Sequence, residues 1–261
     1  MRELTFGYSP CPNDCFAFHA LAFGLIDAPF RVRPVLLDIE ELNRQARDGA
    51  FDLTKLSVGA FASVGDRYRL LRSGAALGHG VGPLVVTRTP MSLADAVRGR
   101  VAIPGRETTA YRLLRLAAPS LTDIVELRYD HILHAVSSGD VHAGLIIHES
   151  RFTYAKHGLH KAADLGDWWE QETGLPVPLA GICVRADLDD ETSAAAERAI
   201  RDSVQYAFDH PDASRDYVQA HAQEMAEEVQ RQHIALYVNS HSLDVGDDGM
   251  RAIARLVAAG S

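Results

Sequence analysis

Short apolar segments rich in β-branched residues alternate with helical segments through the first two thirds of the chain, and this alternation most constrains the fold. The expected strands are residues 4–8, 32–37, 52–57, 69–72, 84–87, 100–103, 124–127, 143–147 and 181–184. The expected helices between them are residues 14–23, 40–48, 109–118 and 131–138. Gly24 and Gly139 provide left-handed caps, and Asp38 can cap the second helix. This pattern predicts an α/β fold around largely parallel sheets.

The C-terminal third is helical in pattern. From about Glu191 onward the expected helices are residues 194–208, 213–221, 224–239 and 248–259. Two strand-like stretches, residues 82–88 and 180–185, are flanked by Gly and Pro on one side and could be crossovers between two lobes. We therefore expect a discontinuous outer lobe, residues 1–87 and 183–261, with residues 88–182 inserted as a second α/β lobe. A cleft between the lobes is then the default ligand site.

Charge and composition narrow the classes of partner. The 26 basic and 35 acidic side chains give a net charge of −9, which argues against a nucleic-acid binder. No apolar run reaches the roughly 18 residues of a membrane span. The first six residues have the pattern of a strand, not of a secretory signal, and three cysteines suit a reducing compartment. We expect a soluble cytoplasmic protein that handles a small molecule.

The segment 9–15, SPCPNDC, follows the first strand and opens the first helix. Such a loop lies at the carboxyl end of a strand, where open α/β sheets place ligands. It is either a rigid cleft loop that presents Ser9, Asn13 and backbone N–H groups, or an ordinary strand-to-helix turn. Cys11 and Cys15 are four residues apart and have no second pair, so we expect no metal here.

The segment 104–111, PGRETTAY, also joins a strand to a helix. Gly105 permits a tight turn, and Thr108 and Thr109 bring two hydroxyls to a helix N-terminus, which favours an anion such as a ligand carboxylate. The alternative is that one threonine is simply the N-cap. With a matching loop in each expected lobe, we favour the ligand site.

Two further strand ends carry chemistry. His148 follows the apolar strand 143–147, and its ordinary pKa of about 6.5 suits proton transfer, although a half-buried histidine bonded to backbone is equally compatible. Lys55 lies inside an apolar run just before Ser57 and is either a cation for an acidic ligand or a surface lysine. His233 and the other histidines of the helical tail are expected at the surface or at caps. No nucleotide-binding glycine motif appears, so we expect no cofactor.

Together these segments resemble 1,4-dihydroxy-6-naphthoate synthase, an enzyme family of the futalosine route to menaquinone. The resemblance spans nearly the whole chain and rests on residues 9–14, 54–57, 108–110, 147–149 and 237–244. It implies a two-lobed fold similar to type II periplasmic binding proteins, with a helical C-terminal region and catalysis in the cytoplasm. Cys15 departs from the family, where threonine is more usual, so no role is assigned to that thiol.

The implied activity is a carbon–carbon lyase that converts cyclic dehypoxanthine futalosine to 1,4-dihydroxy-6-naphthoate and dihydroxyacetone without a cofactor or metal. The resemblance assigns His148 as general base and Thr109, Ala110 and Ser57 as ligand contacts. Direct substrate contacts by Lys55 and Asn13 are our own extrapolation, and the two loop segments described above add Ser9 and Thr108 to the expected substrate contacts. The alternatives are chorismate dehydratase of the same pathway and a non-catalytic protein that binds a small carboxylate.

Overall fold

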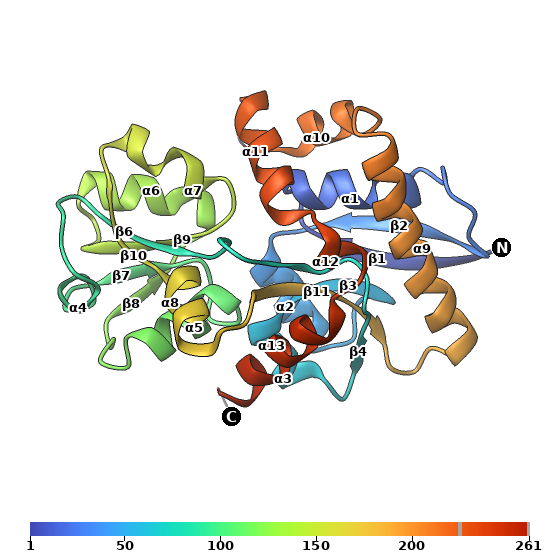
Figure 1. Ribbon diagram of the computed structural model, residues 1–261, viewed down its shortest axis with the longest axis horizontal. Helices are drawn as coiled ribbons and strands as arrows, with labels where there is room; N and C mark the ends of the chain where they lie inside the picture. The colour runs from blue at the N-terminus through green and yellow to red at the C-terminus, as the bar shows by residue number, and fades with distance from the viewer. Residues whose placement is uncertain (224–225, 260–261) are drawn as a thin grey trace.

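Two separate β-sheets organise the chain in the computed structural model, which describes residues 1–223 and 226–259 (Figure 1). The first sheet has the order β2-β1-β3-β11-β4, with β5 also paired to β11. Its strands are β1 (Arg2–Tyr8), β2 (Phe30–Leu36), β3 (Leu53–Ser57), β4 (Tyr68–Leu70), β5 (Ala76–Gly78) and β11 (Val177–Arg185). The second sheet has the order β10-β6-β9-β7-β8. Its strands are β6 (Leu84–Thr87), β7 (Val101–Ile103), β8 (Ile124–Glu126), β9 (Ala143–Ile146) and β10 (His160–Asp164).

Both sheets are mixed, so the prediction of largely parallel sheets is wrong. β1 runs parallel to β2 and β3, whereas β11 runs antiparallel to β3, β4 and β5. In the second sheet β7 runs parallel to β8 and β9, whereas β6 runs antiparallel to β9 and β10. The reversals come from β6 and β11, which enter each sheet from the opposite lobe.

The lobe boundaries differ from those expected from the sequence. β6 was placed at the end of the outer lobe but pairs within the second sheet, and β11 pairs within the first sheet from Val177 onward. The chain therefore crosses between β5 and β6, and again between α8 (Leu165–Thr173) and β11. The first crossing contains Gly82, whose φ of +149° suits glycine. The first crossing thus falls at the start of the predicted stretch 82–88, whereas the second lies before the predicted stretch 180–185, at residues 174–176.

The helices cover both sheets (Figure 1). Around the first sheet lie α1 (Pro12–Ala22), α2 (Ile39–Ala46), α3 (Val58–Val64), α9 (Asp190–Asp209), α10 (Arg215–His221), α11 (Glu227–Tyr237), α12 (Ser240–Leu243) and α13 (Gly246–Ala258). The second lobe also contains α4 (Leu93–Ala96), α5 (Thr109–Ala117), α6 (Tyr129–Ser138) and α7 (Ser150–Thr153). The expected start of one helix at residue 224 lies outside the described residues. Among those described, no helix is long and apolar enough to cross a membrane.

Helix α1 is buried on nearly all sides, because β1 lies beneath it and α9, α10 and α11 pack against it. Phe18 of α1 packs edge-on against Phe6 of β1, with ring centroids 5.1 Å apart. The neighbouring Tyr8 ring lies 5.5 Å from the ring of Phe18. The Tyr8 hydroxyl shares a hydrogen bond with the hydroxyl of Tyr217 in α10. This apolar packing fixes the first turn of α1, and with it the polar residues that precede and begin the helix, inside the protein.

Candidate active site

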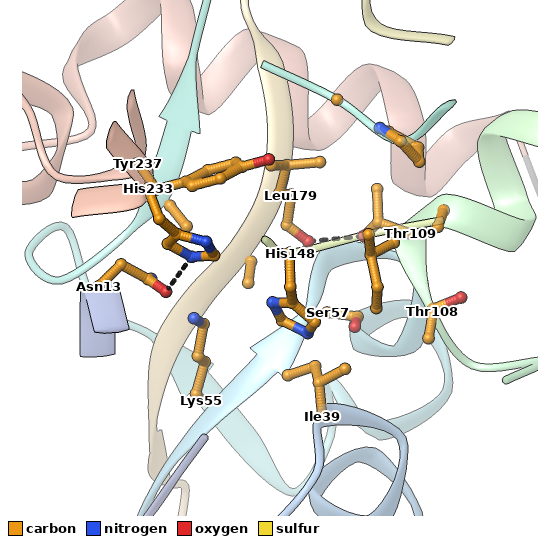
Figure 2. Close-up of a pocket in the computed structure, with 16 residues that line it drawn as sticks. Asn13, Ile39, Lys55, Ser57, Thr108, Thr109, His148, Leu179, His233 and Tyr237 are labelled. Carbon is orange, nitrogen blue, oxygen red and sulfur yellow. Dashed lines mark hydrogen bonds between the residues drawn. The ribbon is translucent and has the colours of Figure 1, made fainter. Parts of the chain in front are cut away.

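A pocket of about 580 Å³, open at its mouth, lies where the ends of β3 and β9 meet α5 and α11 (Figure 2). Among the predicted site residues, those that line it are Asn13, Lys55, Ser57, Thr108, Thr109, Ala110 and His148. The remaining wall is mostly apolar and is formed by Ile39, Ala76, Gly82, Pro83, Ile147, Leu179, Ala180, His233 and Tyr237. Both lobes contribute, so the pocket lies between them.

Ser9 is the predicted contact that does not line the pocket. Its backbone N–H and its hydroxyl donate to one carboxylate oxygen of Asp14, at 3.1 and 2.7 Å. The other oxygen accepts from Asn13 Nδ2 at 2.8 Å and from Lys55 Nζ at 2.5 Å. Four donors therefore converge on one buried carboxylate at the start of α1. Ser9 therefore stabilises the Asp14 carboxylate without lining the pocket itself.

The same cluster changes the interpretation of Lys55. An apparently unpaired lysine in an apolar strand suggested a cation for an acidic ligand, but Lys55 is buried against the equally buried Asp14. The two charges compensate each other, as buried charges must. Lys55 still lines the pocket, where its ammonium carries donors beyond the one that Asp14 accepts. It can therefore donate to a neutral ligand oxygen as well as to an anion.

His148 follows β9 and has a φ of +56°, the one positive value among the described non-glycine residues. Strained backbone of this kind persists where the surroundings hold it, and it gathers at functional sites. The ring packs edge-on against Tyr129, with centroids 4.7 Å apart, and its Nδ1 lies 3.2 Å from Cys11 Sγ. Its Nε2 is buried and has no hydrogen-bond partner among the described residues. One nitrogen is thus held in place, while the other is unpaired in a ring that lines the pocket.

Burial and the nearby Lys55 lower the pKa of His148 from 6.5 to about 3, so the ring is neutral near pH 7. A neutral ring carries one proton, which leaves one nitrogen as an acceptor. Burial also raises the pKa of the Cys11 thiol, so the sulfur is not a thiolate that would draw a second proton. When Nδ1 donates to Cys11, Nε2 becomes the base. Since Cys11 and His148 belong to different lobes, this orientation requires the lobes to be closed.

The start of α5 forms the opposite wall. Thr108 is its N-cap, because the hydroxyl donates to Gly105 O and accepts from Tyr111 N–H. The Thr109 hydroxyl donates to Leu179 O at 2.7 Å and accepts from Gly59 N–H at 2.9 Å, which ties α5 to the first lobe. Both hydroxyls are therefore engaged within the protein. What remains for a ligand is the helix N-terminus itself, with the N–H groups of its first turn.

Ser57 differs from the two threonines. Its hydroxyl accepts from Asn43 Nδ2 at 3.0 Å, and its backbone N–H donates to the Asn43 side-chain oxygen at 2.9 Å. No acceptor is paired with its hydroxyl proton among the bonds of the described residues. Because Ser57 lines the pocket near the start of α5, this proton can be donated to an anion bound there.

His233 is a pocket residue that the sequence analysis assigned wrongly. It was expected at the surface or at a cap, but it lies on the buried face of α11 with only 1% of its surface exposed. Its Nε2 bonds to the side-chain oxygen of Asn13 at 2.9 Å, and its ring stands 4.7 Å from that of Tyr237. A usable signal was present, since Val229, His233 and Tyr237 share one helix face at four-residue spacing.

One group of potential metal ligands occurs among the described residues: Cys11, His148 and Glu149, with ligand atoms within 4.8 Å of one another. A divalent cation would need the Cys11 thiolate, and burial raises the pKa of that thiol. It would also take the Nδ1 of His148 away from its hydrogen bond with Cys11. The arrangement as it stands favours that hydrogen bond.

Comparisons by sequence cover the whole site. A family model described as menaquinone biosynthesis matches residues 4–261. A relative from Thermus thermophilus is 54% identical over 99% of this chain and 94% of its own, and one from Streptomyces coelicolor is 46% identical over 97% and 91%. Both relatives are named 1,4-dihydroxy-6-naphthoate synthase.

Comparisons by structure agree with the two-lobed architecture. A crystal structure from Archaeoglobus fulgidus is 35% identical and superposes with a TM-score of 0.93 over 98% of this chain and 96% of that one. A Candida albicans protein with the generic periplasmic binding protein fold superposes with a TM-score of 0.72, over 100% and 90% of the two chains. That protein is only 14% identical, so the similarity concerns the fold alone. The expected fold class, similar to periplasmic binding proteins, is confirmed.

Proposed function

The chain belongs to the menaquinone biosynthesis family, and on this premise we propose that it is a carbon–carbon lyase that forms 1,4-dihydroxy-6-naphthoate. The substrate in this proposal is cyclic dehypoxanthine futalosine, and the second product is dihydroxyacetone. The observation that carries the assignment is the buried, unpartnered Nε2 of His148 at the pocket. A lyase requires such a proton acceptor beside its substrate.

The pocket suits an aromatic carboxylate. The first turn of α5 and the Ser57 hydroxyl provide donors for the carboxylate at one end. Ile39, Ile147 and Leu179 provide apolar surface for the rings. Asn13 and Lys55 lie on the side away from Thr108 and Thr109, where the polar three-carbon part of the substrate would extend (Figure 2).

The residues divide the chemistry between them. His148 Nε2 removes a proton from the substrate, while Nδ1 carries the ring proton and donates it to Cys11 Sγ. The oxyanion that develops as the carbon–carbon bond breaks is stabilised by Lys55, acting in a site from which closure excludes water. The bond from Gly59 N–H to Thr109 helps hold the lobes closed. All three cysteines are buried free thiols, which suits the cytoplasm as the compartment.

The test uses purified protein with two substrates, cyclic dehypoxanthine futalosine and chorismate, and follows naphthoate formation by absorbance and mass spectrometry. We expect naphthoate from the first and no dehydration of the second. His148→Asn is the informative variant, because asparagine tolerates a positive φ but is not a base. It should bind the product normally and lose about 10²-fold or more in turnover.

The matched control is His134→Asn, since His134 is exposed on α6 in the same lobe. Near-wild-type turnover by His148→Asn would reject His148 as the base. Tight binding of the substrate without product would favour a carboxylate receptor, and conversion of chorismate would favour a dehydratase.

A further inference from the structure

His233 is the second buried histidine that lines the pocket, and the proposed function leaves it without a task. It comes from α11, far along the chain from His148, yet the two rings lie 6.2 Å apart between centroids and are nearly parallel, at 16°. Burial is the main cause that lowers the pKa of His233 well below its ordinary value, so this ring is also neutral. The pocket thus contains two neutral imidazoles side by side.

The hydrogen-bond network fixes which nitrogen of His233 carries the proton. Asp14 is acceptor-only, so the amide nitrogen of Asn13 must face it, and the amide oxygen of Asn13 must face His233. An oxygen accepts, and therefore His233 Nε2 carries the proton and donates. Since the ring is neutral, Nδ1 holds a free lone pair. Lys55 anchors the same chain of bonds through Asp14.

Nδ1 of His233 is buried and has no hydrogen-bond partner among the described residues. A carboxylate oxygen of Glu149 lies 4.0 Å from this nitrogen, which is too far for a hydrogen bond. An unsatisfied buried acceptor costs folding free energy. A folded protein keeps such an atom where a ligand satisfies it, and His233 lies at the pocket wall opposite the start of α5 (Figure 2).

We propose that His233 is a second catalytic residue, whose Nδ1 accepts the proton of a substrate hydroxyl in the three-carbon part of the substrate. This inference rests on the proposed function and deepens it. With the carboxylate end at α5, the three-carbon part extends toward Asn13, Lys55 and His233. His148 and His233 then act on different positions of one substrate.

The step balances without an oxidant or a co-reactant. The hydroxyl proton passes to His233 Nδ1, and the electron pair of that O–H bond becomes the second bond of the carbonyl in the released dihydroxyacetone. The carbon–carbon bond breaks, and its electron pair moves into the adjacent ring ketone, which becomes an enolate. The enolate oxygen then takes the proton back from the imidazolium, which returns the His233 side chain to its neutral form.

The main variant is His233→Gln. The glutamine amide nitrogen can replace Nε2 as donor to Asn13, but glutamine is not a base, so the network is kept while the proton acceptor is lost. In single-turnover experiments with saturating substrate we expect the rate constant to fall by about 10²–10⁴-fold. Affinity for the product naphthoate, measured by calorimetry, should change by less than about threefold. A variant that merely disturbed the structure of the pocket would lose this affinity as well. His134→Gln is the matched control.

A measurement on the wild-type protein tests the tautomer independently. With ¹⁵N-labelled histidine, and His233→Gln used for assignment, the ligand-free protein should show a protonated Nε2 and an unprotonated Nδ1 at His233. A protonated Nδ1, or a single-turnover rate of His233→Gln within about threefold of wild type, would overturn the inference. Failure of the wild-type protein itself to form naphthoate would instead reject the proposed function, and this is known before any variant is tested.

Discussion

Acid should destabilise this protein through its buried neutral histidines, and His148 gives the effect a magnitude. Its pKa is lowered from 6.5 to about 3 by burial and by Lys55. Between these values the unfolded chain binds a proton that the folded protein does not, so stability is full above pH 6.5 and falls as the pH drops toward 3. At about 1.4 kcal/mol per pKa unit the whole shift corresponds to roughly 5 kcal/mol, of which roughly 2 kcal/mol is lost by pH 5.

The assay is urea unfolding at pH 7.5 and pH 5.0, followed by circular dichroism and by the fluorescence of Trp168 and Trp169. We expect the wild-type protein to lose about 2 kcal/mol more free energy of unfolding over this range than His148→Asn does. Burial raises the pKa of Asp38 and Glu40, which acts with the opposite sign, but both proteins share this contribution and it cancels in the difference.

His233 contributes in the same direction as His148. Its pKa is lowered partly by the charge of His148, so removing that ring also weakens the acid sensitivity of His233. The double variant His148→Asn/His233→Gln should therefore show the flattest pH dependence of the three proteins. Equal losses of stability in wild type and His148→Asn would refute the argument, because the ring at position 148 would then not be held neutral by the fold.

Three further predictions concern the groups around these rings. Lys55→Met should lower the free energy of unfolding by about 3–5 kcal/mol in urea titrations, because it leaves the Asp14 carboxylate buried without its cation; a loss below about 1 kcal/mol would contradict this. Cys11→Ala should lower kcat roughly tenfold at constant KM, since His148 loses the partner that fixes its tautomer, and Cys11→Ser should restore it; an unchanged kcat would exclude this role. Gly105→Ala should weaken the affinity for the product, measured by calorimetry, roughly tenfold or more, because φ there is +153° and a Cβ would clash with Glu40 of α2 in the other lobe. An unchanged affinity would show that α5 can shift freely.

Local signals in the sequence were sufficient for much of the fold. The ends of β6 were predicted as observed, because a Gly-Pro pair precedes its apolar, β-branched run and polar residues follow it. Strands β5 and β10 were not predicted, since β5 has three residues and β10 is a polar, partly exposed edge strand without alternation. The direction of β11 could not be predicted either, because it depends on which lobe the chain is leaving.

The candidate site also combines residues that local signals predicted with contacts that no local signal could predict. The strand-end and helix-start signals around Ser57, Thr109 and His148 are local, and the structure brings these residues to one pocket. The contact of Cys11 with His148 joins residues 137 positions apart, and that of Asn13 with His233 joins residues 220 apart. No spacing rule relates such residues, because their proximity depends on lobe closure in one case and on the docking of α11 against α1 in the other.

In the proposed mechanism, two buried nitrogens without a hydrogen-bond partner among the described residues distinguish this cleft from one that merely binds a ligand. A receptor gains affinity by satisfying every polar group of its ligand, and it is stabilised when its own buried groups are already paired. Neither His148 Nε2 nor His233 Nδ1 has a hydrogen-bond partner within the described part of the chain, and each such atom costs about 1–3 kcal/mol in the ligand-free protein. Neighbouring bonds, to Cys11 and to Asn13, hold each ring so that its free nitrogen cannot turn away. An acceptor fixed in this way cannot relax, so a substrate that supplies an O–H or C–H proton is the means of satisfying it.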